Sequence, residues 1–458
     1  LKAQLFQEAL RNYNVQRHSY SKCFKAAMNS LIVALLPIGV LGSCPFMDIG
    51  TPPSLKAEVI SDSDFKTALE GLDIEALEQD LRVLMTDSQT CWPADDGHYG
   101  GFMIRLAWHC AGTFRTSDQK GGCGGARIRF PPESDWEDNG NLDKARALLV
   151  PIKQKYGDAL SWGDLISFAG TVAIRDMGGP TNPHCFGRVD DADGNKSDIF
   201  GVTDSWQDTD CVVQGNCQEP MGAVKVGLIY VNPEGPLNDP NDLNSGQNPD
   251  PEKSAVEIRE VFGRMGMNDS ETASLIAGGH AFGKCHGAGV MTSGFEGPWT
   301  TTPSQWTNQF LTGMLDEEWE QVATPSGSAV QWQTKDRTSI LAGTMRLTAD
   351  LALVSDDAYL ALAKHWVCDQ QKLDIAFAAS WKKLVESGGG WLPVEDRRCE
   401  PESKATGQQT DPQKNFHSVC ATTTTDDSQE ASTATKFCLS FLAVVFTPFS
   451  LGVHSWLA

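Results

Sequence analysis

Residues 101–129, GFMIRLAWHCAGTFRTSDQKGGCGGARIR, join an apolar segment to a glycine-rich loop. The first half is predicted to be a helix that carries Arg105, Trp108 and His109. The helical period of 3.6 residues places these three side chains on neighbouring positions of one face. Glycines at four of the five positions from 121 to 125 allow the chain to turn sharply after the helix. We therefore expect an arginine, an indole and an imidazole to converge at one place.

These three side chains suit the chemistry of hydrogen peroxide. His109 can take a proton from the peroxide and return it to the departing oxygen, while Arg105 stabilises the negative charge that develops as the O–O bond breaks. Burying an unpaired guanidinium without such a purpose is costly. The alternative is a packed helix with a snorkelling arginine and a core histidine, and the R-x-x-W-H pattern alone leaves both interpretations open.

A second group of side chains lies in residues 270–287, SETASLIAGGHAFGKCHG. Two glycines precede His280, so the backbone there can approach something large and flat. With His280 on iron, Lys284 and His286 near the propionates, and the first helix across the ring, the set fits one haem b per chain. A structural zinc site is the competing metal hypothesis, but paired C-x-x-C ligands are missing from these spacings.

The motifs between about residues 100 and 385 resemble those of a known family: RLAWHCAGT, WEDN, LSWGDLI, YVNPEGP, FGRMGMND, AGGHAFGKCHG, WTTTPSQW and LTADLAL. They are similar to the N-terminal, haem-bearing half of catalase-peroxidases, which belong to the class I haem peroxidases together with cytochrome c and ascorbate peroxidases. The resemblance implies a mainly α, two-lobed helical fold with long loop insertions and with haem between the lobes.

The resemblance assigns roles to further residues. Asn139 orients His109, and Asp138 lines the peroxide channel. Asp350 accepts the other ring proton of the iron-binding histidine, which makes the imidazole more basic and favours the high-valent ferryl state. Trp299 is the proximal indole beside this pair. Cys110 and Cys285 are interpreted as small buried residues and not as ligands.

Catalase activity in this family depends on a covalent adduct, and its three partners have matching positions in Trp108, Tyr230 and Met265. The family also carries a mobile arginine shortly after the helix that matches residues 377–384. Ser387 stands at that position here. We therefore expect weakened or pH-shifted catalase turnover with peroxidase activity retained.

The function implied is haem-dependent removal of hydrogen peroxide, with oxidation of a small reducing donor or of a second peroxide. The alternative is a monofunctional class I peroxidase of the cytochrome c or ascorbate peroxidase type. Ascorbate is not favoured as donor, because Thr292 replaces the arginine of ascorbate peroxidases. A haem-binding scaffold without turnover is the hypothesis from another class. A homodimer is left open, and the net charge of −22 argues against nucleic acid as partner.

Composition divides the chain into four parts: a presequence with a signal segment and linker at 1–60, the haem peroxidase domain at 61–400, a polar Thr/Ser-rich linker at 401–436, and a hydrophobic tail at 437–458. Helical patterns are expected at 63–85, 141–156, 161–176, 252–265, 270–280 and 338–381, with irregular segments at 178–248 and 287–337.

Both ends predict the secretory route, so that the protein is secreted or membrane-anchored, or reaches an organelle after secretory entry. The apolar run at 31–41 is too short to span a bilayer and is typical of a signal peptide, the alternative being a buried helix. The tail suits a tail anchor or a GPI-attachment signal, the alternative being a packed helix. In an oxidising compartment, Cys211 and Cys217 form the disulfide that is easiest to propose, and Asn195 and Asn268 are sequon positions.

Overall fold

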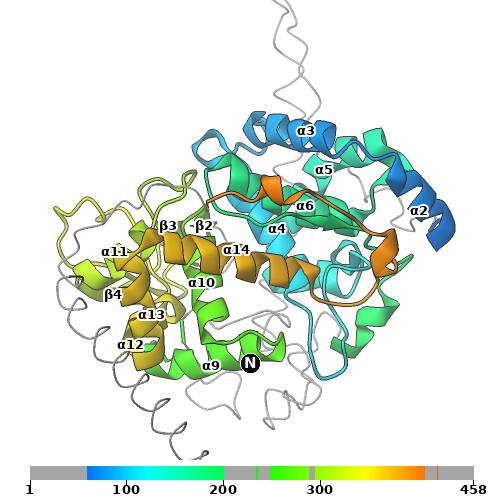
Figure 1. The fold of residues 1–458 in the computed structure, drawn as a ribbon. Helices are drawn as coiled ribbons and strands as arrows, with labels where there is room; N and C mark the ends of the chain where they lie inside the picture. Colours follow the sequence, from blue (N-terminus) through cyan, green and yellow to red (C-terminus); the bar gives the residue numbers. More distant parts are fainter. Residues whose placement is uncertain (1–58, 201–233, 236–247, 288–293, 408–419, 421–458) are drawn as a thin grey trace, which may run out of the picture. The chain divides into compact units, whose positions relative to one another are not determined.

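The computed structural model describes residues 59–200, 234–235, 248–287, 294–407 and 420 (Figure 1). The predicted signal segment, most of the polar linker and the hydrophobic tail lie outside the described residues. The same holds for four individually named side chains, which are Cys211, Cys217, Tyr230 and Thr292.

The described part of the chain is mainly helical, as predicted. Its α-helices are α2 (Asp62–Glu70), α3 (Ile74–Thr86), α4 (Gly100–Ala111), α5 (Leu142–Tyr156), α6 (Trp162–Asp176), α9 (Pro251–Arg264), α10 (Asp269–Gly279), α11 (Gln309–Asp316), α12 (Thr348–Ser355), α13 (Asp357–Cys368) and α14 (Gln370–Glu386). The strands form antiparallel pairs: β1 (Cys185–Phe186) with β6 (Arg398–Cys399), β2 (Lys284–His286) with β3 (Glu296–Pro298), and β4 (Trp319–Ala323) with β5 (Val330–Thr334).

Two of the expected helical segments are interrupted. The pattern over 63–85 continues through a break after α2, where the side chain of Asp73 accepts the backbone N–H of Ala76 and starts α3 anew. An N-cap of this kind ends one helix and begins another without disturbing the apolar spacing. The segment 338–381 contains three helices, and the first of them begins only at Thr348. By contrast, α6 begins as predicted, because Ser161 Oγ accepts the backbone N–H of Asp164 at 3.0 Å.

The helices form two groups, which agrees with the two-lobed arrangement that the resemblance implies. In the first group α3, α4, α5 and α6 pack on one another, and in the second α10 packs on α9, α13 and α14. Helix α14 also contacts α4 and so joins the two groups (Figure 1). Helices α4 and α6 approach closely at Gly170, where an added Cβ would lie 2.5 Å from that of Ala107. This close approach fixes the helix that carries His109.

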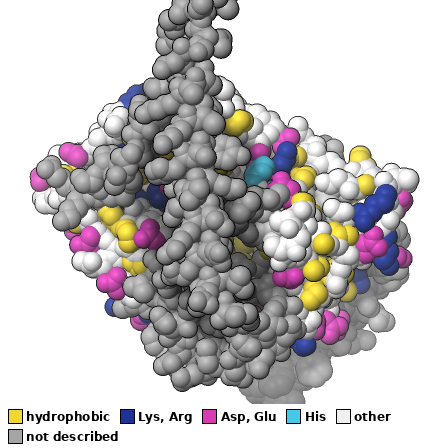
Figure 2. Space-filling model, turned by 180° about the vertical axis from the view of Figure 1, so that it is seen from behind, with side chains coloured by type: hydrophobic (Ala, Val, Ile, Leu, Met, Phe, Trp, Pro, Cys, Tyr) yellow, Lys and Arg dark blue, Asp and Glu magenta, His cyan; other side chains and the backbone are white. Residues whose placement is uncertain are grey.

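Charged side chains of both signs are mixed on the described surface of the face shown in Figure 2, where acidic groups lie among basic ones. Within the described residues, no helix is both long enough and apolar enough to cross a membrane.

Three disulfides join cysteines of the described residues: Cys110–Cys123, Cys185–Cys399 and Cys368–Cys420. Cys110 is buried, as predicted, but it also forms a disulfide that was not predicted, because the glycine-rich loop returns to α4 and brings Cys123 against it. Cys285 is a free thiol, and it is half-buried and not fully buried as predicted.

A buried ion pair connects α6 to the end of the described domain. Arg175 donates to both carboxylate oxygens of Glu400, at 2.8 and 2.6 Å, and both side chains are buried. Because Arg175→Leu leaves a buried carboxylate without its partner, we expect the free energy of unfolding to fall by about 3 kcal/mol.

Chemical denaturation of the purified protein measures this loss. Lys335 pairs with Glu318 at 3.0 Å on the surface, and Lys335→Ala is the control, with an expected cost below about 1 kcal/mol. Equal effects of the two substitutions would contradict a structural role for the buried pair.

Candidate haem-binding and catalytic site

His109 lies in the last turn of α4 and is buried. Its Nδ1 is 2.7 Å from Oδ1 of Asn139. The Asn139 amide nitrogen donates to the carbonyl of Glu133 at 2.6 Å, so the amide oxygen faces the imidazole. Nδ1 of His109 therefore carries the ring proton and donates it to Asn139, and Nε2 is left as an unprotonated acceptor.

The charge state of His109 suits a proton acceptor. Burial and, to a smaller extent, the positive charge of Arg105 hold the pKa of the imidazole well below its ordinary value of 6.5. The imidazole is consequently neutral at pH 7. Asn139, predicted from the resemblance as the orienting residue, has the geometry for that role.

Arg105 is held by backbone carbonyls. Its Nη2 donates to the carbonyl of Asp138 at 2.6 Å, and its Nη1 donates to that of Gly140 at 3.1 Å. The carboxylate of Asp138 lies 3.6 Å from Nδ1 of His109. Burial raises the pKa of Asp138 to about 6, and the charge of Arg105 opposes this rise. The segment around Asn139 therefore positions all of the predicted polar groups on this side.

The titration of Asp138 gives a testable pH dependence. Above about pH 6 the charged carboxylate stabilises a proton arriving on His109, so the rate of the peroxide reaction is expected to rise several-fold through this pH. Asp138→Asn should remove that step, which stopped-flow measurement of the peroxide reaction across pH will detect. Asp135→Asn, at an exposed position nearby, is the control and should keep the step.

The predicted adduct partners are only partly described. The indole of Trp108 stacks on the ring of Phe262, with centroids 5.2 Å apart and an interplanar angle of 22°. Met265 is buried at the end of α9. Because Tyr230 lies outside the described residues, the adduct stays a prediction.

His280 follows the last residue of α10 and pairs with a buried carboxylate. Its Nδ1 donates to Oδ1 of Asp350 at 2.7 Å. The other oxygen of Asp350 accepts the indole N–H of Trp299 at 2.9 Å and the backbone N–H of Leu347 at 2.8 Å. The indole and the imidazole also stack, with centroids 4.2 Å apart. The three residues expected on the proximal side thus form one hydrogen-bonded unit.

The backbone just before His280 is packed on one side and open on the other. An added Cβ at Gly278 would collide with Phe377, 2.2 Å away, whereas one at Gly279 would meet nothing within 4 Å. Nδ1 is committed to Asp350, and Nε2 has no hydrogen-bond partner in the described part of the chain. An imidazole whose Nδ1 donates to a carboxylate, so that Nε2 remains an acceptor, is the ligand that haem iron accepts.

The two groups of side chains lie close together in space. An added Cβ at Gly101, the second residue of α4, would come 2.8 Å from the Cα of Gly283, three residues after His280. The thiol of Cys285 interacts electrostatically with both Arg105 and Asp350, and burial raises its pKa to about 12. The Cys285 thiol is therefore protonated at neutral pH and lies near both groups.

Lys284 and His286 already have carboxylate partners, which the sequence analysis missed. Lys284 pairs with Asp96 at 2.9 Å, and Nε2 of His286 lies 2.7 Å from Asp95. The hydrogen bond to Asp95 raises the pKa of His286, which favours its charged form. Lys284 and His286 stay candidates for binding the haem propionates. The adjacent acidic residues Asp95 and Asp96, shortly before α4, were the sequence signal from which these ion pairs could have been predicted.

Comparison with known proteins gives one consistent result. A model of the peroxidase family matches residues 85–369. The chain is 41% identical to a catalase-peroxidase of Saccharophagus degradans over 406 residues, which cover 76% of this chain and 53% of the relative. A catalase-peroxidase of a Caulobacter species is 43% identical over 366 residues, covering 70% and 48%. A catalase-peroxidase of Natronomonas pharaonis is 42% identical over 374 residues, covering 72% and 51%. The chain spans about half the length of the curated relatives it matches.

Proposed function

This chain belongs to the peroxidase family, and from that membership and the geometry of its site we propose that it removes hydrogen peroxide in the manner of a catalase-peroxidase. One observation carries the proposal. His109 and His280 each donate Nδ1–H to a fixed acceptor and each keep Nε2 available, in two segments that touch through Gly101 and Gly283.

Each residue of the site has a defined task in this proposal. His280 would hold the haem iron, with Lys284 and His286 placed for the propionates; when bound, haem supplies the electrons that cleave the O–O bond. Nε2 of His109 takes a proton from one peroxide oxygen and delivers it to the other, which leaves as water. Arg105 stabilises the negative charge on the departing oxygen.

Asp350 acts on the proximal side through His280. By accepting the Nδ1 proton at 2.7 Å, it fixes the tautomer and the orientation of the ring, so that Nε2 is left to bind the iron. The indole of Trp299 donates to the same carboxylate at 2.9 Å, so its ring is held parallel to the imidazole, with an interplanar angle of 17°. A rigid proximal base of this kind supports both catalase and peroxidase turnover.

We propose further that oxygen release is weak or shifted in pH, whereas oxidation of a small donor is retained. Ser387 follows α14, and its hydroxyl donates to the carbonyl of Lys383 at 2.6 Å. The next residues are locked against the glycine-rich loop, where an added Cβ on Gly124 would lie 1.8 Å from the carbonyl oxygen of Gly389. Residue 387 thus carries no positive charge, and the packed backbone after it would restrict the movement of a side chain at this position. A monofunctional class I peroxidase is the second candidate, favoured by this same feature.

Oxygen evolution and donor oxidation, measured on one haem-loaded sample across pH, test both proposals. We expect slow oxygen release beside rapid oxidation of a chromogenic phenol, and Ser387→Arg is expected to increase oxygen release. Oxygen release at neutral pH that equals the peroxidase rate would contradict the proposed weakening. Donor oxidation without oxygen release would support the monofunctional candidate. The absence of both activities would refute peroxide removal and favour a haem-binding scaffold.

We also propose that the protein enters the secretory pathway, with either secretion or a membrane tether as its final state. Three disulfides among the described residues support an oxidising compartment. Asn195 of the first sequon is exposed and accessible to glycosylation. Glycosidase digestion of the protein from its native source should lower its apparent mass, and phase separation before and after phospholipase treatment distinguishes a GPI anchor from a tail anchor.

A further inference from the structure

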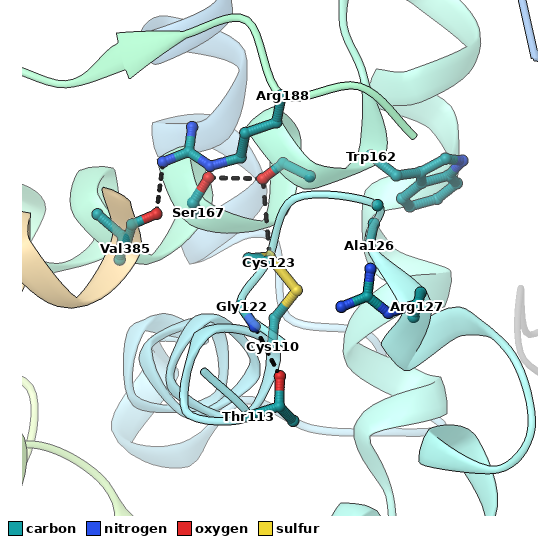
Figure 3. The surroundings of a disulfide bond; sticks show 12 residues. Cys110, Thr113, Gly122, Cys123, Ala126, Arg127, Trp162, Ser167, Arg188 and Val385 are labelled. Carbon is teal, nitrogen blue, oxygen red and sulfur yellow. Dashed lines mark hydrogen bonds between the residues drawn. A yellow bond between two sulfur atoms is a disulfide. The ribbon is translucent and has the colours of Figure 1, made fainter. Parts of the chain in front are cut away.

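A disulfide is attached directly next to the proposed catalytic base. Cys110 is the residue after His109 in the last turn of α4, and its sulfur is bonded to Cys123 in the glycine-rich loop. The two side chains are 1% and 0% exposed, so the bond lies in the interior. Figure 3 shows it bridging the helix and the loop that returns toward it.

The last turn of α4 is the part of this helix that most needs support. Helix ends lack the hydrogen bonds of the interior and open first in local unfolding. The helix ends at Ala111, only two residues after His109. Beyond it, the backbone N–H of Gly122 donates to Thr113 Oγ1 at 2.9 Å, and Arg264 donates to the carbonyl of Gly112 at 2.7 Å. These contacts act on residues that follow the helix, whereas the disulfide acts within its last turn.

The loop at the other end of the disulfide is firmly fixed. An added Cβ on Gly122 would lie 2.5 Å from the carbonyl oxygen of Ser387, so the two backbones are in direct contact. On the other side, the sulfur of Cys123 lies 3.8 Å from the carbonyl oxygen of Gly163 in α6. The loop is therefore held between α6 and the segment after α14, and Cys123 moves only if they move.

We propose that the Cys110–Cys123 disulfide is a positioning element for His109, which transmits the rigidity of the packed loop to the helical turn that presents Nε2 to the peroxide. This inference rests on the proposed function. Asn139 fixes the rotation of the imidazole from one side at 2.7 Å. The disulfide fixes the backbone that carries it, so the two restraints are complementary.

Loss of this restraint has a specific consequence for acid–base behaviour. The charged groups that face His109 are Arg105 on the same helix and Asp138 on the opposite segment. Burial is the largest cause of the lowered pKa of His109. A looser turn admits water, so this pKa rises toward its ordinary value and the imidazole becomes protonated at higher pH. The part of the acid limb that reports His109 then moves to higher pH, and measuring it in the Asp138→Asn background removes the separate step near pH 6, which rehydration would move to lower pH.

The test compares two haem-loaded double variants of the full chain. Cys110→Ala/Cys123→Ala removes the proposed positioning element. Cys185→Ala/Cys399→Ala is the matched control, because it removes a disulfide that joins β1 to β6 and is not attached to α4. Two properties are measured for each variant: amide hydrogen exchange of a peptide covering residues 106–114, and the pH dependence of the second-order rate constant for peroxide.

We expect both double variants to lower the melting temperature, but only the first to change the site. In the first, exchange over residues 106–114 should accelerate, the rate constant should fall about tenfold, and its acid limb should move to higher pH. A rate profile and an exchange pattern equal to those of the control would overturn the inference and leave the bond as a simple crosslink. If wild-type protein failed to react with peroxide, the proposed function would fail, while hydrogen exchange and NMR titration of His109 would still decide the inference.

A milder variant, which keeps the disulfide, provides a second measurement in case the double variant misfolds. Thr113→Val keeps the disulfide but removes the hydrogen bond from Gly122, which ties the chain two residues beyond the helix to the same loop. We expect changes in the same direction and of smaller size. Unaltered exchange over residues 106–114 in this variant, together with an unaltered profile of the disulfide variant, would contradict the inference.

Discussion

His109→Gln is expected to lower the second-order rate constant of the peroxide reaction about a thousandfold, with haem binding preserved. Glutamine keeps a hydrogen-bonding side chain beside Asn139 but has no basic nitrogen, so no group accepts the peroxide proton. Because the pKa of His109 lies well below 6.5, its imidazole stays neutral, and able to accept the peroxide proton, well into the acid range. Protonation of His109 should therefore slow the wild-type reaction only at a pH well below 6.5. Stopped-flow absorbance of the haem protein measures both effects.

His184→Gln provides the control for this substitution. His184 is also buried, and burial also holds its pKa well below its ordinary value, but its ring nitrogens face Thr171 and Arg188. We expect this variant to react with peroxide at nearly the wild-type rate per bound haem. An equal loss in both variants would show that a buried histidine matters for folding alone, and would contradict the assignment of His109 as the base.

His280→Ala is expected to abolish stable haem binding, since the nitrogen ligand of the iron is removed. Asp350→Asn should have a graded effect, because the amide can still accept the Nδ1 proton but lacks the negative charge. We expect a loss of about 10- to 100-fold in haem affinity or in the rate of the peroxide reaction. Titration of the haem-free protein with haem, followed by its visible absorption, measures the affinity directly.

Asp374 offers a matched control for Asp350. It is buried and accepts the indole N–H of Trp306 at 2.9 Å, as Asp350 accepts that of Trp299, but its second partner is Gln370 and not a histidine. Asp374→Asn should leave haem affinity unchanged. If Asp350→Asn behaved like this control, the carboxylate would stabilise the fold without acting on the iron ligand.

The sequence was sufficient for those parts of the site that lie within short motifs. The helix with Arg105 and His109, the capped start of α6 and the position of His280 after paired glycines all follow from local spacing and were found. The hydrogen bond between His280 and Asp350 joins residues 70 positions apart, and only the family resemblance supplied it.

The features that were missed depend on tertiary contacts that local patterns do not encode. The break between α2 and α3 keeps the apolar spacing of one continuous helix, so the period alone does not reveal it. Pairing of Cys110 with Cys123 requires that the glycine-rich loop folds back, which 13 residues of separation permit but do not dictate. The carboxylates that pair with Lys284 and His286 come from a short helical turn far away in the sequence.

At the contact between Gly101 and Gly283, the two halves of the site are separated only by their backbones, with no side chain between them. Neither residue has a side chain, so the start of α4 rests directly on the chain that continues from His280. Any larger residue at position 101 would push α4 away from the chain after His280. The separation of the two segments that would enclose the haem would then increase with the size of the side chain. A library with both positions randomised and selected for haem retention would accordingly be expected to return glycine at each of them.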